Sequence, residues 1–157
     1  GLILGEAYAA TLQVMQQSNG PAAARLAPLA HAMTDVTGFG LLGHLLEVCR
    51  GAKLSATLVM GKVPLLSDVE RLATAGYITG ASARNWMAYG DDVVLDPAIT
   101  PMQRALLTDP QTSGGLLVAC APDAVDEVLA VFHADGFAAA AAIGHLASGA
   151  AQVSVGV

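Results

Sequence analysis

The sequence predicts an α/β or α+β domain in which helices cover a mixed β-sheet. Segments with helical spacing of apolar residues alternate along the chain with short extended apolar segments. The 157 residues are 54% hydrophobic and 13% charged, which is typical of a compact globular chain and not of a disordered one. A chain of this length fits one domain, residues 1–157, that buries about 70% of its unfolded surface. No internal repeat interrupts the pattern.

The first third of the chain alternates helices with one extended segment. We expect a helix at 6–17, a loop at 18–21, a helical piece ending at 29, an extended segment at 30–36 and a helix at 38–50. Gly38 and Gly40 permit a tight turn before the last helix. The apolar residues of that helix recur with helical spacing and are interpreted as core: Leu41, Leu42, Leu45, Leu46 and Val48.

The rest of the chain continues the alternation. We expect strands at 53–60, 91–95, 115–120, 137–144 and 152–157, and helices at 67–75, 101–107 and 123–134. Ser67 with Glu70 suggests a capping box, and Gly136 ends the last helix. The alanine run at 138–142 is short and flanked by glycines, so we interpret it as a buried strand. For Trp86, Met87 and Tyr89 we favour packing over a lid above a nucleotide.

Charge and hydropathy exclude several function classes. The net charge is −6 with seven basic residues, and these form no cluster, so neither nucleic acid nor an anionic membrane is expected as a partner. No run of about 18 strongly apolar residues and no basic leader is seen, so we expect a cytoplasmic protein without a membrane span. Because Gly1 stands inside an apolar run, we expect the chain to begin partway through a larger protein.

Cysteine and histidine spacing argues against a zinc or redox site. Cys49 and Cys120 form no CxxC pair and are expected to be buried thiols. The histidines show no helical i, i+4 pairing, so each is expected to be a surface or capping residue: His31, His44, His133 and His145.

The run HAMTDVTGFGLLGH places Asp35 between an extended segment and the glycine-rich start of a helix. The free N–H groups of a first helical turn favour an anion, which Asp35 would repel unless a cation stood between them. Magnesium fits, because it is usually held by one or two carboxylates together with substrate phosphates. A plain N-cap role for the aspartate or a threonine remains open.

The same run contains glycines with the spacing of the dinucleotide-binding fingerprint, Gly38, Gly40 and Gly43. That fingerprint needs a buried apolar strand before it and an acidic residue about twenty positions on. Thr34 and Asp35 make the preceding segment polar, and the next strand leads to Gly61 and Lys62. A nicotinamide or flavin site is therefore not expected.

A second polar stretch, TDPQTSGG, precedes an apolar strand. Pro110 holds Asp109 extended, and Ser113, Gly114 and Gly115 can form a turn whose N–H groups make an anion-binding nest. An ordinary helix-to-strand turn uses the same residue types, and on these residues alone it is the favoured interpretation.

Together, TDVTGFGLLGHLLEV and LLTDPQTSGGLLVAC resemble the two signature stretches of the C-terminal domain of the selenophosphate synthetases, within the AIR synthase-related, PurM-like family. The resemblance extends to SNGPAAA near Ser18, VPLL near Pro64, the pair Arg84 and Asn85, and the closing GFAAAAAIGHL. It therefore covers nearly the whole chain. Related aminoimidazole ribonucleotide synthetases, hydrogenase-maturation proteins and thiamine-monophosphate kinases share the fold, but both stretches look most like the selenium enzyme.

The resemblance implies an ATP-dependent enzyme that makes selenophosphate from selenide and water, releasing AMP and phosphate, with Mg²⁺ bridging the nucleotide phosphates. It places the metal-binding aspartate at Asp35. Residues implied to lie near the nucleotide phosphates are Thr34, Thr37, Gly38, Gly40, Asn85, Asp109, Gln111, Thr112, Ser113 and Gly114.

The family's N-terminal ATP-binding domain, with its glycine-rich segment, further aspartates and reactive Cys or selenocysteine near a Lys, has no counterpart in this sequence. We therefore expect no catalytic residue in this chain and no activity from it alone. Its expected partners are that domain, the substrates ATP and selenide, and a second copy in a full-length homodimer. The alternative is a non-catalytic PurM-like binding or assembly module.

Overall fold

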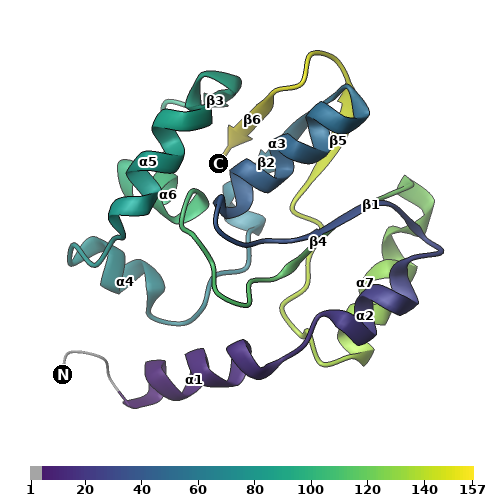
Figure 1. Ribbon diagram of the computed structural model, residues 1–157, viewed down its shortest axis with the longest axis horizontal. Helices are drawn as coiled ribbons and strands as arrows, with labels where there is room; N and C mark the ends of the chain where they lie inside the picture. The colour runs from purple at the N-terminus through teal and green to yellow at the C-terminus, as the bar shows by residue number, and fades with distance from the viewer. Residues whose placement is uncertain (1–4) are drawn as a thin grey trace.

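The computed structural model describes residues 5–157, without the side chains of residues 6 and 7. It contains two sheets with helices packed against them, so the predicted mixed arrangement of helices and strands is confirmed (Figure 1). None of the helices within the described residues is long and apolar enough to cross a membrane.

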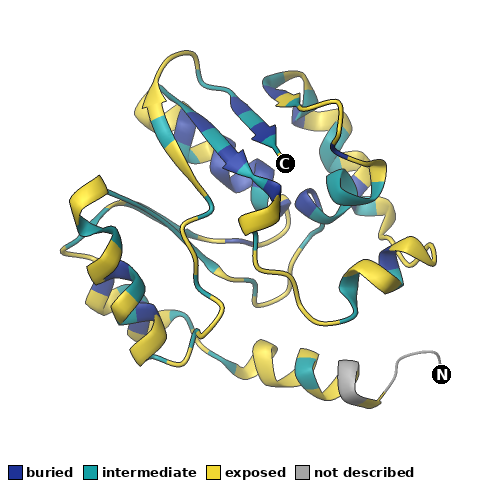
Figure 2. Cartoon of the chain, turned by 180° about the vertical axis from the view of Figure 1, so that it is seen from behind, coloured by how far each residue is buried: buried dark blue, intermediate teal, exposed yellow. Residues whose placement is uncertain are grey.

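The larger sheet has four strands in the order β3-β6-β2-β5. Strand β2 (Leu54–Val59) runs antiparallel to β5 (Gly144–Ser148) and parallel to β6 (Val153–Gly156), which is parallel to β3 (Val93–Leu95). Helix α3 (Gly40–Ala52) packs on this sheet (Figure 1), and the buried residues gather between them (Figure 2). The largest fully buried side chains of this core are Leu42, Leu46, Cys49, Leu58, Leu107 and Val153.

The smaller sheet is an antiparallel pair, β1 (Ala30–Asp35) with β4 (Leu116–Cys120). Helices α2 (Gly20–Leu26) and α7 (Val125–Ala134) enclose a second core with it, formed by Ala22, Leu26, Val128 and Phe132. Asp35 pairs with Leu116 at the end of this ribbon. The pairing therefore brings the two polar stretches identified in the sequence to the same end of one sheet.

Helix α1 (Gly5–Gln16) extends away from both cores along one side of the molecule (Figures 1 and 2). The helix predicted at 6–17 is therefore confirmed. Several of its apolar side chains are exposed: Tyr8, Leu12, Val14 and Met15.

Three helices form the remaining side of the molecule: α4 (Val69–Thr74), α5 (Gly80–Tyr89) and α6 (Pro101–Leu107). Helix α5 was not predicted, because its sequence lacks a regular apolar stripe. It begins at Thr79, whose hydroxyl accepts from the Ser82 N–H. The capping box expected at Ser67 was wrong, since α4 begins after Asp68, which makes no side-chain cap. A capping box is present instead at the start of α6, between Thr100 and Gln103.

The predicted strand at 137–144 was also wrong. The Ala140 N–H donates to the Phe137 carbonyl in a turn, and Phe137 packs edge-on against Phe132. Strand β5 begins at Gly144, where an added Cβ would lie 2.0 Å from the Thr57 carbonyl oxygen. Alanines carry too little side chain to hold a strand in place here, so the segment turns before it joins the sheet.

Short 3-10 turns complete the chain at Met60–Lys62, Gly90–Asp92 and Pro122–Ala124. The helix expected from residue 38 begins at Gly40, because the Gly40 N–H first closes a turn onto the Thr37 carbonyl. The expected burial of the thiols is confirmed fully for Cys49 and in part for Cys120. Burial raises the pKa of both.

Candidate functional site

Two loops meet at the end of the β1–β4 ribbon. The first loop, residues 35–40, joins β1 to α3, and the second loop, residues 108–115, joins α6 to β4. The Val36 N–H donates to the Gly115 carbonyl at 2.8 Å, and the Gln111 N–H donates to the Thr37 carbonyl at 3.0 Å. The loops therefore continue the ribbon as one hydrogen-bonded unit.

Two glycines permit this close approach. A Cβ on Gly114 would lie 2.0 Å from the Val36 carbonyl oxygen. Gly40 has φ of +69°, and a Cβ on it would lie 2.6 Å from the Thr108 carbonyl carbon. Any other residue would push the loops apart at either position.

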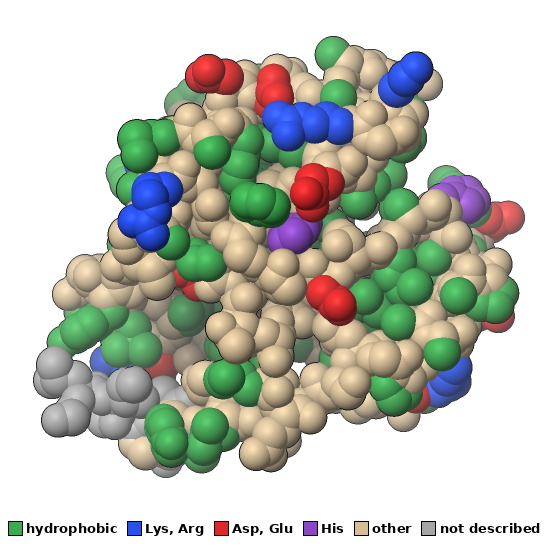
Figure 3. Space-filling model, in the orientation of Figure 1, with side chains coloured by type: hydrophobic (Ala, Val, Ile, Leu, Met, Phe, Trp, Pro, Cys, Tyr) green, Lys and Arg blue, Asp and Glu red, His purple; other side chains and the backbone are tan. Residues whose placement is uncertain are grey.

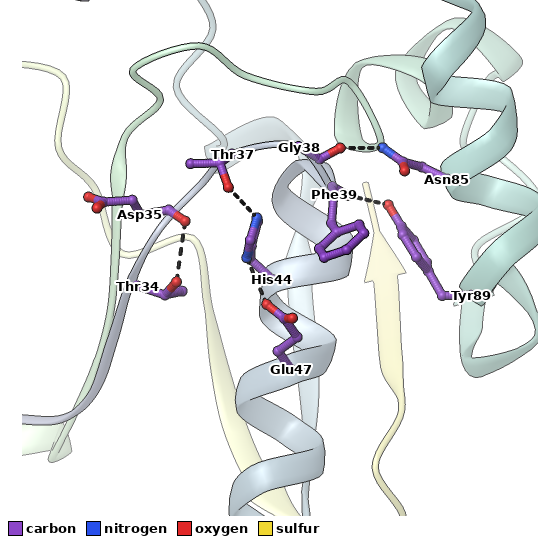
Figure 4. A network of polar contacts seen from close by, with 9 residues as sticks. All are labelled: Thr34, Asp35, Thr37, Gly38, Phe39, His44, Glu47, Asn85 and Tyr89. Atoms are coloured by element: carbon purple, nitrogen blue, oxygen red, sulfur yellow. Dashed lines mark hydrogen bonds and ion pairs between the residues drawn. The ribbon is translucent and has the colours of Figure 1, made fainter.

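Helix α5 fixes the loops from the other side. The Asn85 amide donates to the Gly38 and Thr108 carbonyls, each at 2.9 Å, so one side chain joins both loops. The Tyr89 hydroxyl donates to the Phe39 carbonyl at 2.6 Å (Figure 4). Burial raises the pKa of Tyr89 to about 12. The Asn85 amide, with its bonds to Gly38 and Thr108, uses both of its N–H donors inside the protein.

Asp35 lies at the end of β1 with an exposed side chain. Its Oδ1 accepts from the Asn19 amide at 2.8 Å, and the same amide nitrogen donates to the Gly114 carbonyl at 2.9 Å. Its other oxygen accepts no hydrogen bond from the described residues. The Thr34 hydroxyl donates to the backbone carbonyl of Asp35, not to its carboxylate (Figure 4).

A cavity of about 380 Å³ opens beside this carboxylate. It brings together four of the residues predicted from the sequence, Asp35, Thr37, Ser113 and Gly114. Residues 15–20, at the end of α1 and the start of α2, form its other wall. Asn19 belongs to that wall and was not predicted as a site residue. The stretch SNGPAAA contained it, but nothing in the sequence pointed to Asp35 as its partner.

Neither the aspartate nor a threonine caps α3, so the N-cap alternative was wrong. The residue at the cap position is Phe39, which makes no side-chain cap. The Thr37 hydroxyl lies 3.1 Å from Nε2 of His44, and Nδ1 of that ring lies 2.8 Å from a carboxylate oxygen of Glu47 (Figure 4). Because a carboxylate oxygen accepts, Nδ1 of His44 donates the hydrogen bond to Glu47.

His44 is buried, so the expectation that all four histidines lie on the surface or at caps was wrong for this one. Thr37 and Glu47 satisfy both ring nitrogens, which permits burial next to the apolar core. The other three histidines, His31, His133 and His145, are exposed as predicted.

Asp109 is directed away from the Asp35 cavity. It accepts from the hydroxyls of Thr79 and Ser82, at 3.2 and 3.4 Å, and from the Gln111 amide at 3.3 Å. Burial raises the pKa of Asp109, and the bonds from the two hydroxyls oppose that rise. It borders a separate cavity of about 240 Å³ with otherwise apolar walls, built from α4, α6 and residues 77–78. Asp109 and Gln111 thus do not line the Asp35 cavity, while Thr112 is an exposed residue of the second loop.

Comparison with known proteins gives the family. The sequence profile of "AIR synthase related protein, C-terminal domain" matches residues 6–156. The chain belongs to this family. It is 56% identical over 151 residues to the selenide, water dikinase of Burkholderia pseudomallei (strain K96243), which covers 96% of this chain and 43% of the relative.

Two further relatives of the AIR synthase related C-terminal domain carry the same name. The selenide, water dikinase of Pseudomonas straminea is 59% identical over 126 residues, 80% of this chain and 35% of the relative. That of Dechloromonas aromatica (strain RCB) is 47% identical over 150 residues, 94% of this chain and 43% of the relative. The predicted resemblance is confirmed, and the chain spans less than half the length of these relatives.

The AIR synthase related domain offers a cation only part of a coordination shell. Among the described residues, no group of three His, Cys, Asp or Glu side chains lies close enough to hold a metal ion. One free carboxylate oxygen beside a water-accessible cavity suits a hard cation that keeps several waters and takes its other ligands from substrate phosphates. The donor chemistry at Asp35 therefore fits Mg²⁺ better than a metal held entirely by protein ligands.

Proposed function

We propose that this chain is the C-terminal part of an ATP-dependent enzyme that makes selenophosphate from selenide and water, with AMP and phosphate as the other products. Its role there is to supply Asp35 as one Mg²⁺ ligand and to enclose the nucleotide phosphates. The observation that carries the proposal is the exposed Asp35 carboxylate, held by Asn19 beside a cavity that both signature loops line.

The charge around the cavity supports a cation at this site. Its lining residues include no Lys or Arg among those described. The few Lys and Arg side chains on the face shown in Figure 3 are scattered and do not gather at one place. An acidic chain with a net charge of −6 needs a cation to hold phosphates next to a carboxylate. When bound, Mg²⁺ offsets the charge that develops on phosphoryl oxygens as a bond to phosphorus breaks.

The described residues divide the remaining work. Thr37, Ser113 and Gly114 line the cavity and form the wall that faces the phosphates. Gly38, Gly40, Asn85 and Thr34 shape the loops that form this wall. Asp109 and Gln111 stabilise the start of α5 and the second loop. In this proposal the reactive residue, the further metal ligands and most of the ATP site belong to a separate N-terminal domain. The full-length protein is a homodimer in the cytoplasm.

Phosphorus NMR of the full-length protein with ATP, Mg²⁺ and selenide tests this function. We expect a selenide-dependent selenophosphate signal together with AMP, and loss of both in Asp35→Asn. Ser67→Ala is a matched control, because that exposed residue lies outside both loops and caps no helix. Intact ATP after incubation with a folded wild-type protein would contradict the proposal and favour a non-catalytic binding module.

A further inference from the structure

We propose that Asn19 is the positioning residue of the Asp35 carboxylate: it holds one oxygen and leaves the other facing the cation. This inference rests on the proposed function, because it assigns a role to Asn19 only if Asp35 binds a cation. It concerns the residue directly before α2, outside both signature loops.

Asn19 occupies the N-cap position of α2 but does not cap the helix. It has helical backbone angles, φ −74° and ψ −16°, and makes no side-chain cap hydrogen bond. Asparagine is among the preferred N-cap residues because its side-chain oxygen usually accepts from the first-turn N–H groups. Here the amide is directed to the loops instead, so the usual explanation for an asparagine at this position does not apply.

The amide makes two hydrogen bonds over long sequence separations. Nδ2 donates to Oδ1 of Asp35 at 2.8 Å and to the Gly114 carbonyl at 2.9 Å, residues that lie 16 and 95 positions away. The second bond fixes the amide against the backbone of the second loop. That loop is itself fixed, since Gly114 lies in contact with Val36. The first bond then sets where the carboxylate points.

No other described residue donates to this carboxylate. Figure 4 shows it directed away from the His44 ring. Without Asn19 the exposed side chain is free to rotate. Residues that orient a metal ligand typically change metal affinity by about 10- to 100-fold when they are removed.

Asn85 provides a matched control. Its amide also joins the two loops, through the Gly38 and Thr108 carbonyls at 2.9 Å each, but it does not contact Asp35. Removing Asn85 therefore loosens the loops to a similar degree without releasing the carboxylate. A difference in metal affinity between Asn19→Ala and Asn85→Ala therefore reports the hydrogen bond from Asn19 to Asp35.

The test is a titration of the full-length protein with Mn²⁺ in the absence of selenide. The EPR signal of the free ion measures how much Mn²⁺ stays unbound. We expect Asn19→Ala to weaken the Asp35-dependent Mn²⁺ site about 10-fold, and Asn85→Ala to change it less than about 2-fold. In an Asp35→Asn background, Asn19→Ala should have no further effect, because the interaction it removes is already lost.

The outcomes separate the two proposals. Equal weakening by Asn19→Ala and Asn85→Ala, or none by Asn19→Ala, overturns the role of Asn19 while leaving Asp35 as a ligand. Unchanged Mn²⁺ affinity in Asp35→Asn overturns both. If Asn19→Ala does not fold by circular dichroism, Asn19→Leu preserves the volume of the side chain without its donors, and the same result is expected of it.

Discussion

Replacing Gly114 with alanine should separate the two loops. The new Cβ would lie 2.0 Å from the Val36 carbonyl oxygen and 2.8 Å from the Gln111 Cβ. The second loop must move by about 1.4 Å to restore ordinary contact with that oxygen. Such a shift stretches three hydrogen bonds that join the loops and Asn19: Val36 to Gly115, Gln111 to Thr37, and Asn19 to Gly114.

At about 1 kcal/mol for each bond, Gly114→Ala should lower the free energy of unfolding by about 2–3 kcal/mol. For a chain of this size the midpoint of thermal unfolding should fall by about 5–10 °C. Urea and thermal denaturation of the chain measure both quantities. Gly115→Ala is the matched control, because an added Cβ there meets no atom within 4 Å, and its effect should stay within about 0.5 kcal/mol. If the two variants lose the same stability, the close contact with Val36 is not the cause.

Three further outcomes follow from single contacts. Thr100→Ala removes the capping box with Gln103 and should lower the free energy of unfolding by about 1 kcal/mol in urea denaturation; no change would show that the cap adds nothing. Leu46→Ala, at a fully buried position, should cost about 2–5 kcal/mol in the same assay, and a loss below 1 kcal/mol would contradict its place in the core. Burial raises the pKa of Tyr89 from 10 to about 12 in the folded protein. The neutral phenol therefore stabilises the fold fully below pH 10, and this contribution is lost as the pH rises from 10 to 12. Tyr89→Phe should therefore lose less stability than the wild type between pH 10 and 12, measured by urea denaturation at each pH. The same pH dependence in both proteins would refute the raised pKa of Tyr89.

The predictions that succeeded were those that depend on local periodicity. Helix α3 and helix α7 each carry apolar side chains at helical spacing, and the same side chains form the two cores, with Leu46 in one and Phe132 in the other. Strand β4 was predicted because a short apolar run follows a glycine turn. In such segments each residue's neighbours on the helix or strand already decide which face is buried.

Several features that the sequence did not reveal depend on partners far away along the chain. The alanine run before Gly144 has strand-like flanks, but the strand that pairs with β2 begins only at Gly144. The surroundings of Asp109 depend on the hydroxyls of Thr79 and Ser82, which lie 30 and 27 positions away along the chain. Asn19 could not be linked to Asp35 without knowing that β1 pairs with β4.

His44 is an intermediate case. Its bond to Glu47, three residues later on the same helix, could have been inferred from helical spacing. Its bond to Thr37 could not, because it depends on how the first loop turns before α3. His44 was assigned to the surface because only one of its two hydrogen-bond partners, Glu47, could be inferred from the sequence.

The separation of 95 positions between Asn19 and Gly114 determines when the site can exist. During synthesis, a ribosome that has released everything up to α6 has already produced Asp35, Asn19 and Asn85, yet the carbonyl that fixes the Asn19 amide is still missing. The cavity beside Asp35 is therefore complete only after the second loop has emerged, because Ser113 and Gly114 form part of its lining.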